Sequence, residues 1–386
     1  MKRMSLFGCL CGILLSAACE RLDTNRLEIG PDETTLFTLD EVARLLAAVP
    51  IGTAQMDEVH DAVSSSTENG YDEEYPMRQV FTAPGAGIGS EGDTRAEQYP
   101  EPLRDLLTAE IQRQYGTRAT DADAFLEALS SSDVQIYWPY SEEFDSAGTP
   151  VITFDPGDNS TRNTGFLRRE DGTVEEVTVD EDMARERPVW VISRNLDAEY
   201  LSLEMLRRQD PDWGRGGGSI LVGTRAGEHD FQTLVLRSIQ ANRPFDTWFA
   251  GGSEIWVKVG AVEDFTASTE AELRLYSPSI TDFLIVIPRS KVGKKVDFNA
   301  VLVSEWTGML DNCALMIIEE DGGTQTSWKC SATVKYNSKS YGFEINIPLN
   351  SRDDIIWRGS LTRSYIEKYS GTTGHFGDVD LVLELI

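Results

Sequence analysis

Short strand-like segments recur along the carboxyl-terminal half of this chain and limit what it can fold into. Each is rich in apolar, β-branched or aromatic residues and is bounded by turn residues, whereas helical patterns are few in this half. Regular short strands of this kind are typical of an antiparallel β-sandwich. The predicted strands are Glu254–Val259, Glu272–Tyr276, Phe283–Ile287, Val296–Val303, Ala314–Ile318, Ser331–Val334, Phe343–Ile347 and Val379–Leu385.

These strands place an antiparallel β-sandwich domain at residues 219–386. Its later part, from residue 280 onwards, has acidic turns and ends on a strand. In this it resembles the C2-like sandwiches of many secreted bacterial proteins. An immunoglobulin-like sandwich is the alternative, because the likeness stays at the level of the fold.

The amino-terminal half carries helical patterns instead. The segment Thr38–Glu41 has the form of a capping box, in which the threonine oxygen accepts a helix N–H and the glutamate reaches back. Apolar residues then recur at helical spacing up to Val49 and again over Met56–Val63. Residues 37–131 are therefore predicted to form an α-helical region.

A small β subdomain is predicted at residues 132–200. Apolar runs there are broken by prolines, and Asp171-Gly172 lies between two strand-like segments, which indicates a hairpin. Residues 201–218 are charged and then rich in glycine, so they are predicted to be a linker. The expected fold class is mainly β, with an amino-terminal α-helical region and a carboxyl-terminal antiparallel sandwich.

The first residues have the order of a secretory signal. Lys2-Arg3 gives a positive start, residues 6–15 are apolar, and Ser16–Ala18 supplies small residues before Cys19. Small residues followed by cysteine resemble the lipobox of bacterial lipoproteins, in which the cysteine is lipidated and becomes the new amino terminus. The match departs from that family at Ser16, where leucine is usual. An ordinary secretory signal with Cys19 as a spectator is the alternative.

This resemblance implies a signal peptide at residues 1–18 and a lipidated tether at residues 19–36. In lipoproteins of Gram-negative bacteria an aspartate after the cysteine tends to retain the protein at the inner membrane, and this chain has Glu20 there. The charged run Cys19–Asp23 also resembles the surface-export signals of Bacteroidales lipoproteins. The implied location is the outer membrane of a Gram-negative bacterium, with a lipid anchor and exposure at the cell surface.

Acidic residues outnumber basic ones by 64 to 35, and the whole chain has a net charge of −29. Loss of residues 1–18 would remove two basic residues and no acid, which leaves a mature charge of about −31. Such a surface repels phosphates, so nucleic acid is excluded as a partner. The acids either keep the protein soluble or bind calcium, which prefers carboxylate oxygens. No other cofactor is expected.

Local signatures of catalysis are missing from the sequence. It has three histidines and no His-Glu-x-x-His pair, so the usual zinc protease motif is absent. It also lacks a Gly-x-Ser-x-Gly nucleophile elbow and a phosphate-binding loop. These absences favour a non-enzymatic protein, but carboxylate pairs leave no local motif and the question of an activity stays open.

Three aromatic residues at the end of one predicted strand are candidate ligand-binding residues. Tyr137, Trp138 and Tyr140 lie within four positions of one another. Exposed rings stack on sugars or peptides. Alternation places Tyr137 and Trp138 on opposite faces of the strand, so the alternative is that at least one of them belongs to a core.

A calcium site is predicted from an up-and-down meander between Phe283 and Ile347. Counting strand reversals in such a meander places Asp321, Asp353 and Asp354 at one end of the sheet, where their oxygens would form a weak site. Three lysines of the 288–295 loop lie at the same end under this count. Simple neutralisation of the acids by these lysines is the alternative.

A disulfide between Cys313 and Cys330 is predicted from a hairpin. Asp321-Gly322 is the strongest hairpin signal in the chain, because a type I′ turn needs positive φ at both central residues. This turn would place the two cysteines opposite each other in a non-hydrogen-bonded pair, where side chains approach closely. The alternatives are two buried free thiols, or a turn shifted to Gly322-Gly323 that places Cys330 opposite Leu315.

The leading functional hypothesis is a non-enzymatic cell-surface lipoprotein that binds a glycan, peptide or envelope protein through its β domains. The alternative is an extracellular hydrolase of glycan or peptide that uses carboxylates, with or without calcium. A third hypothesis is a structural part of an envelope assembly, which predicts a large exposed apolar patch.

Replacing Cys19 with alanine tests the anchor. The Cys19→Ala protein should lack the lipid and accumulate in the periplasm or as an unprocessed precursor, because the cysteine thiol is the group that is lipidated. Membrane fractionation and the mass of the mature amino terminus measure this, with Cys330→Ala as the matched control. Membrane association and processing that match the control would contradict lipidation.

Overall fold

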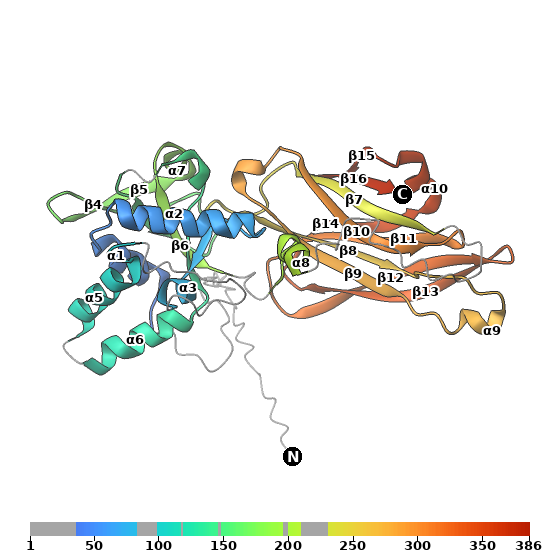
Figure 1. Cartoon of the computed structure of the whole chain (residues 1–386), viewed down its shortest axis with the longest axis horizontal. Coiled ribbons are helices and arrows are strands. Elements are labelled where there is room, and N and C mark those ends of the chain that lie inside the picture. The colour runs from blue at the N-terminus through green and yellow to red at the C-terminus, as the bar shows by residue number, and fades with distance from the viewer. Residues whose placement is uncertain (1–35, 83–98, 117–118, 146–147, 196–199, 210–230) are drawn as a thin grey trace, which may run out of the picture. The chain divides into compact units, whose positions relative to one another are not determined.

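Strands dominate the computed structural model, and most of its helices lie near the amino-terminal end of the chain (Figure 1). This confirms the predicted mainly β fold with amino-terminal helices. Cys19 and the predicted signal peptide and tether fall outside the described part of the chain, apart from Leu36. The structure describes residues 36–82, 99–116, 119–145, 148–195, 200–209 and 231–386.

The first sheet has six strands in the order β1-β2-β6-β3-β4-β5. β3 and β6 run parallel, and the other neighbouring strands are antiparallel. The predicted hairpin at Asp171-Gly172 joins β4 to β5, and Gly172 has a φ of 85° in its turn. The strands are β1 (Glu74–Pro76), β2 (Val134–Tyr137), β3 (Val151–Phe154), β4 (Arg162–Arg168), β5 (Val174–Asp180) and β6 (Val189–Arg194).

Helices cover one face of this sheet. Leu46 of α1 and Val59 of α2 lie in one hydrophobic core with Trp138, Ile152 and Trp190 of the sheet region. The predicted helical region and the predicted β subdomain therefore share a core and are not separate folding regions. The helices are α1 (Leu39–Ala48), α2 (Thr53–Glu68), α3 (Met77–Phe81), α5 (Leu103–Tyr115) and α6 (Ala119–Ser131).

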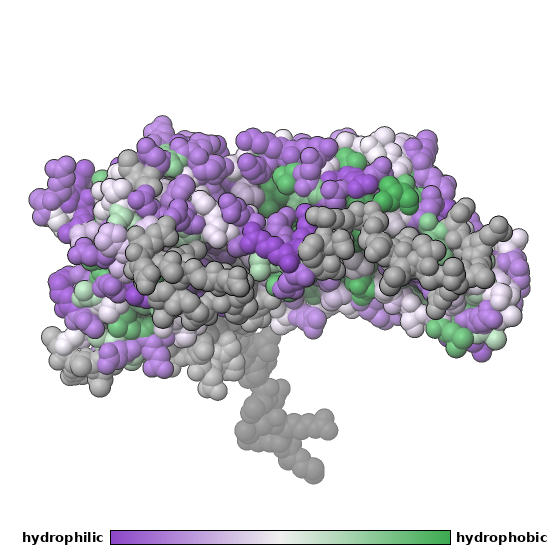
Figure 2. Space-filling view, in the orientation of Figure 1, coloured by the Kyte–Doolittle hydropathy of each residue, from purple (hydrophilic) through white to green (hydrophobic). Residues whose placement is uncertain are grey.

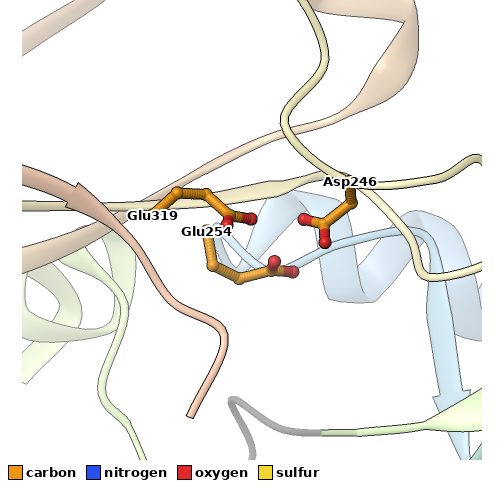
Figure 3. A group of neighbouring side chains, drawn as sticks. All are labelled: Asp246, Glu254 and Glu319. Atoms are coloured by element: carbon orange, nitrogen blue, oxygen red, sulfur yellow. The ribbon is translucent and has the colours of Figure 1, made fainter. Parts of the chain in front are cut away.

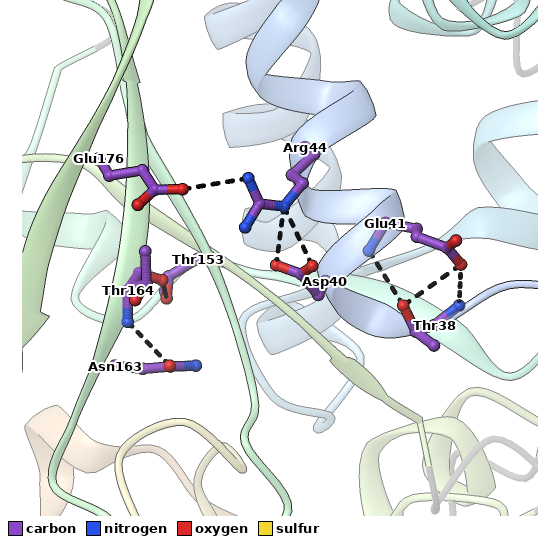
Figure 4. Close-up of polar contacts among 8 residues, drawn as sticks. All are labelled: Thr38, Asp40, Glu41, Arg44, Thr153, Asn163, Thr164 and Glu176. Atoms are coloured by element: carbon purple, nitrogen blue, oxygen red, sulfur yellow. Dashed lines mark hydrogen bonds and ion pairs between the residues drawn. The ribbon is translucent and has the colours of Figure 1, made fainter. Parts of the chain in front are cut away.

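Local contacts fix α1 at its start and tie it to the sheet (Figure 4). The Glu41 N–H donates to the Thr38 hydroxyl at 3.2 Å, and the Thr38 N–H donates to the Glu41 carboxylate at 2.7 Å, which confirms the capping box. Arg44 donates to Glu176 of β5 at 3.1 Å and also pairs with Asp40 of its own helix. Both ion pairs are exposed, so they orient the helix more than they stabilise it.

The opposite face of the first sheet is buried as well. Alternation places Tyr137 and Trp138 on opposite faces, and both are 0% exposed because both faces are covered. Tyr140 is 2% exposed and donates its hydroxyl proton to Glu181 at 2.6 Å. The prediction that these three rings form a ligand-binding surface is therefore wrong. They belong to the core, beside the short elements η1 (Ser141–Glu143) and α7 (Glu181–Glu186).

The carboxyl-terminal strands form two antiparallel sheets around one large core. One sheet has the order β10-β7-β16-β15, and the other has the order β13-β12-β11-β8-β9, with β14 also paired to β11. The predicted sandwich is thus confirmed. Its strands are β7 (Gln232–Ala241), β8 (Ser253–Ala261), β9 (Ser279–Ile287), β10 (Val296–Trp306), β11 (Leu310–Glu319), β12 (Gln325–Tyr336), β13 (Lys339–Asn350), β14 (Asp354–Thr362), β15 (Thr372–Phe376) and β16 (Val379–Leu385).

Two details of the predicted sandwich are wrong. The meander assumed from β9 onwards fails, because β9 pairs with β8 whereas the next strand, β10, pairs with β7 in the other sheet. The predicted strand Glu272–Tyr276 begins within helix α9 (Glu270–Leu273), since the Thr269 hydroxyl accepts the Glu272 N–H and caps a helical turn.

The predicted linker contains α8 (Leu203–Gln209), and its remaining part after residue 209 falls outside the described residues. The other short elements are η2 (Arg289–Lys291) and α10 (Arg363–Tyr369).

The predicted disulfide is also wrong, because Cys313 and Cys330 are both free. The positive φ angles fall at Gly322 and Gly323, with values of 69° and 103°, so the chain does not turn at Asp321-Gly322. β11 leaves β12 after a short contact and pairs with β14, which places Cys313 opposite Leu361. Cys330 lies opposite Ile345 of β13. A third strand has therefore taken the place that the simple hairpin gave to β12.

No helix among the described residues is both long and apolar enough to cross a membrane.

Truncation of Leu46 tests whether the helices and the first sheet share a core. Leu46 is 0% exposed, and Leu46→Ala should lower the free energy of unfolding by about 2–5 kcal/mol because it opens a cavity. Hydrogen exchange followed by mass spectrometry should then rise in α1 and in β6 together. The matched control is Leu201→Ala, because Leu201 is 47% exposed. This substitution should change the free energy of unfolding by no more than about 0.5 kcal/mol. Faster exchange in α1 alone would mean separate cores.

Candidate metal centre

Three carboxylates converge at one end of the sandwich. Asp246, Glu254 and Glu319 each offer one oxygen, and these oxygens all lie within 4.8 Å of one another. Figure 3 shows the three carboxyl groups turned toward a common space. This is the group among the described residues whose geometry suits a metal ion.

Neighbouring strands bring these side chains together. Glu254 is the second residue of β8, and Glu319 is the last residue of β11, which pairs with β8. The Glu320 N–H donates to the Glu254 carbonyl oxygen at 3.1 Å and holds the two strand ends side by side. Asp246 comes from the segment that joins β7 to β8. The site therefore rests on two hydrogen-bonded strands and one connecting loop.

Glu319 is unusual because an acid occupies a core position. It ends an apolar strand and is 1% exposed. Buried carboxylates are rare unless they are paired or bind a metal. Glu319 Oε1 and Asp246 Oδ2 are both buried and have no hydrogen-bond donor among the described residues. Two acceptor oxygens in such a place require either a proton or a cation between them.

Burial raises the pKa of Glu319 well above its usual range, and a hydrogen bond to Asp246 raises it further. Burial also raises the pKa of Asp246, although the same hydrogen bond and the charge of Arg289 oppose this. Without a cation, Glu319 therefore keeps a proton at neutral pH and shares it with Asp246. A metal ion that binds there must displace this proton.

The chemistry of the three ligands favours calcium. All of them are carboxylate oxygens, which hard cations prefer, and the group contains no histidine or cysteine of the kind that zinc prefers. Calcium accepts oxygens at about 2.3–2.6 Å, so two ligands of one ion lie up to about 5 Å apart. Magnesium needs tighter octahedral geometry with bonds of about 2.0–2.1 Å. A set of three carboxylates is therefore of the kind that calcium binds.

The acids predicted to bind calcium lie beside this site but do not form it. Asp353 accepts the N–H groups of Asp321 and Asn350 at 3.3 and 2.7 Å, so both of its oxygens hold a loop together. Asp354 begins β14 opposite Glu319, and its charge raises the pKa of Glu319. The prediction found the acidic end of the sandwich, but the carboxylates that converge are different ones.

Two of the three lysines that were expected to neutralise Asp321, Asp353 and Asp354 have contacts with other acids. Lys295 pairs with Asp297 at 3.3 Å, and the charge of Lys291 lowers the pKa of Glu142. The charge of Arg289 lowers the pKa of Asp246, and Arg289 donates to the Asp246 carbonyl oxygen at 3.2 Å. A single buried guanidinium thus faces several acids.

A polar cavity of about 210 Å³ lies away from the three carboxylates. It is bounded by α2, β1, α3 and α8, and Asn69, Tyr71 and Asn195 are among its lining residues. Glu74 is the carboxylate that lines it. The cavity and the converging acids are therefore separate features.

No family model, curated protein or solved structure matches this chain. The C2-like character of the sandwich therefore stays a prediction.

Asp321 should make the stability of the metal-free protein depend on pH. Burial and the charges of Asp246 and Asp354 raise the pKa of Asp321 to about 6 from a usual 3.8. A raised pKa in the folded state gives stability that is complete below about pH 4 and is lost as the pH rises through about 6. Asp321→Asn should therefore match the wild type near pH 4 and exceed it at pH 7 by on the order of 1 kcal/mol, a value reduced for partial exposure.

Urea unfolding at several pH values in EDTA measures this difference. Asp282→Asn on β9 is the matched control, because it makes the same chemical change at an exposed residue. A difference between Asp321→Asn and wild type that does not grow with pH would contradict the raised pKa.

Proposed function

We propose that this chain is an exported, lipid-anchored, non-enzymatic protein that binds a calcium ion through Asp246, Glu254 and Glu319. One observation carries the proposal. Glu319 is a buried acid whose oxygen meets those of two other acids and has no hydrogen-bond donor among the described residues. A divalent cation there would bind the unpartnered oxygens of Glu319 and Asp246 together with an oxygen of Glu254.

The burial of Glu319 favours cation binding over hydrolysis. A glycoside hydrolase needs two carboxyl groups that flank the scissile bond, roughly 5–10 Å apart, with the sugar between them. Here the oxygens lie within 4.8 Å of one another and Glu319 is 1% exposed, which leaves no room for a sugar or peptide. The polar cavity, which has room for a small molecule, presents Glu74 and no second carboxylate among the described residues that line it.

Support for the location comes from the amino terminus, where Cys19 follows a signal-like sequence. The proposed attachment is a lipid anchor in the outer membrane, with the protein at the cell surface. Calcium sites of extracellular modules have dissociation constants on the order of 10⁻⁴–10⁻³ M. A site of this strength would fill outside a cell, where free calcium is high, and stay unloaded in the cytoplasm.

One face of the molecule favours a binding role over a structural role in an envelope assembly. Figure 2 shows a face on which hydrophilic residues dominate and apolar residues form small separate groups. A structural assembly part would present a large continuous apolar patch. The proposed partner is a glycan or protein that meets the polar surface of the β domains.

Calcium titration of Glu319→Gln tests the site. Glutamine copies the protonated form of Glu319, so the fold should persist while the ligand charge is lost. Isothermal titration should show wild-type binding with a dissociation constant on the order of 10⁻⁴–10⁻³ M, and affinity at least about tenfold weaker in Glu319→Gln. Wild-type affinity should also rise with pH, because the ion displaces a proton.

Glu344→Gln on β13 is the matched control, since Glu344 is exposed and pairs with Lys329 at 3.9 Å. This variant should bind calcium as the wild type does. Magnesium should bind more weakly than calcium. Equal calcium affinity in wild type and Glu319→Gln would rule out the proposed site.

A further inference from the structure

The loop between β7 and β8 (residues 242–252) carries one calcium ligand and also enters the core of the first sheet. Trp248 and Phe249 are 2% and 0% exposed and belong to a hydrophobic cluster with Tyr137 and Tyr140. The Trp248 indole N–H donates to the Thr161 carbonyl oxygen at 3.0 Å. Two large side chains from the sandwich region thus complete the second buried face of the first sheet.

The end of this loop is held by a buried acid. The Gly252 N–H donates to Asp72 Oδ2 at 2.6 Å. A Cβ atom on Gly252 would lie 2.8 Å from the Ile287 carbonyl oxygen and 3.1 Å from Asp72 Oδ1, so only glycine fits at this position. Gly251 has a φ of 124°, which other residues rarely adopt. The loop is therefore shaped to fit against Asp72.

Arg289 links the start of the loop to the same cluster. It donates to the Asp246 carbonyl oxygen at 3.2 Å and to the Glu181 carboxylate at 3.1 Å, and its side chain is 7% exposed. Glu181 in turn accepts the Tyr140 hydroxyl. A chain of contacts therefore runs from the backbone of a calcium ligand to the buried face of the first sheet.

Charge repulsion acts against this docked loop. Asp72 is 3% exposed, and its Oδ1 has no hydrogen-bond partner among the described residues. Burial raises the pKa of Asp72 to about 6, and the charge of Asp246 contributes to the rise. The negative charges of Asp72 and Asp246 disfavour each other's position. A cation on Asp246 would remove most of this repulsion.

We infer that calcium at Asp246, Glu254 and Glu319 clamps the β7–β8 loop, so that the ion controls how firmly Trp248 and Phe249 stay in the core of the first sheet. This inference rests on the proposed function and adds a regulatory role to the same site. Asp246 lies two residues before Trp248, so an ion that fixes Asp246 also fixes the start of the buried segment. Loss of the ion would release that segment together with its contacts to Tyr137 and Tyr140.

Hydrogen exchange of the full chain, followed by mass spectrometry with and without calcium, tests this clamp. If opening of the loop requires release of the ion, calcium at ten times its dissociation constant should slow exchange over residues 242–252 about tenfold. Peptides of β3 and β4 should be protected as well, because Val151 and Leu167 belong to the same hydrophobic cluster as Trp248. Peptides of β15 and β16 should not respond.

Matched variants make the test specific. Protection by calcium should vanish in Glu319→Gln and persist in Glu344→Gln. Coupling between two sites is reciprocal, so Trp248→Ala should bind calcium more weakly although it removes no ligand, while Trp328→Ala on β12 should bind normally. Trp248→Phe, which keeps an aromatic ring in the core, should fall between wild type and Trp248→Ala.

The outcomes separate this inference from the proposed function. Normal calcium affinity in the titration with no change of exchange over residues 242–252 would overturn the clamp and leave calcium binding intact. Wild-type calcium affinity in Trp248→Ala would also overturn it. Absence of any calcium binding would overturn both proposals.

Discussion

Burial of the first sheet on both of its faces is the constraint on which the rest of the structure depends. A strand that is covered on one side alternates apolar and polar residues, but Ile136 to Trp138 and Val189 to Ile192 are apolar throughout. The helices satisfy one face, and the other face is closed by Trp248 and Phe249 from a distant loop. Because these two side chains are buried against the first sheet, the loop is held in place. Its position in turn sets where Asp246 lies in relation to Glu254 and Glu319.

Local patterns in the sequence were enough to predict individual helices and hairpins but not which strands pair with one another. The capping box at Thr38 and the hairpin at Asp171-Gly172 depend on neighbouring residues, and both predictions are confirmed. The meander and the cysteine register depended on which strands pair, and both are wrong. β10 lies in the other sheet, and β14 takes the place of most of β12 beside β11. Both pairings depend on how side chains pack across the whole sandwich. The strand at Glu272 was lost to a helical turn because the cap at Thr269 was overlooked.

The candidate metal site was even harder to predict from the sequence than the strand pairing. Its acids come from a loop and from two strands, and Glu254 and Glu319 are 65 positions apart. In a chain with 64 acids, no spacing rule distinguishes these three from the rest. Asp321, Asp353 and Asp354 were brought together only by counting strand reversals in a meander that the fold does not have. The one clue was Glu319 at the end of an apolar strand, and its meaning depends on burial, which a single sequence does not give.

β13 is an edge strand of the sandwich, and its open side bears on how these molecules behave when crowded together. A free edge is a template on which another chain can add a strand and begin aggregation. Pro348 lies within β13 and offers no N–H, while the exposed Lys339 and Glu344 add charge along the strand. A dense layer of identical copies would bring such edges face to face. The proline and the charges make β13 a poor template for joining two copies into a shared sheet.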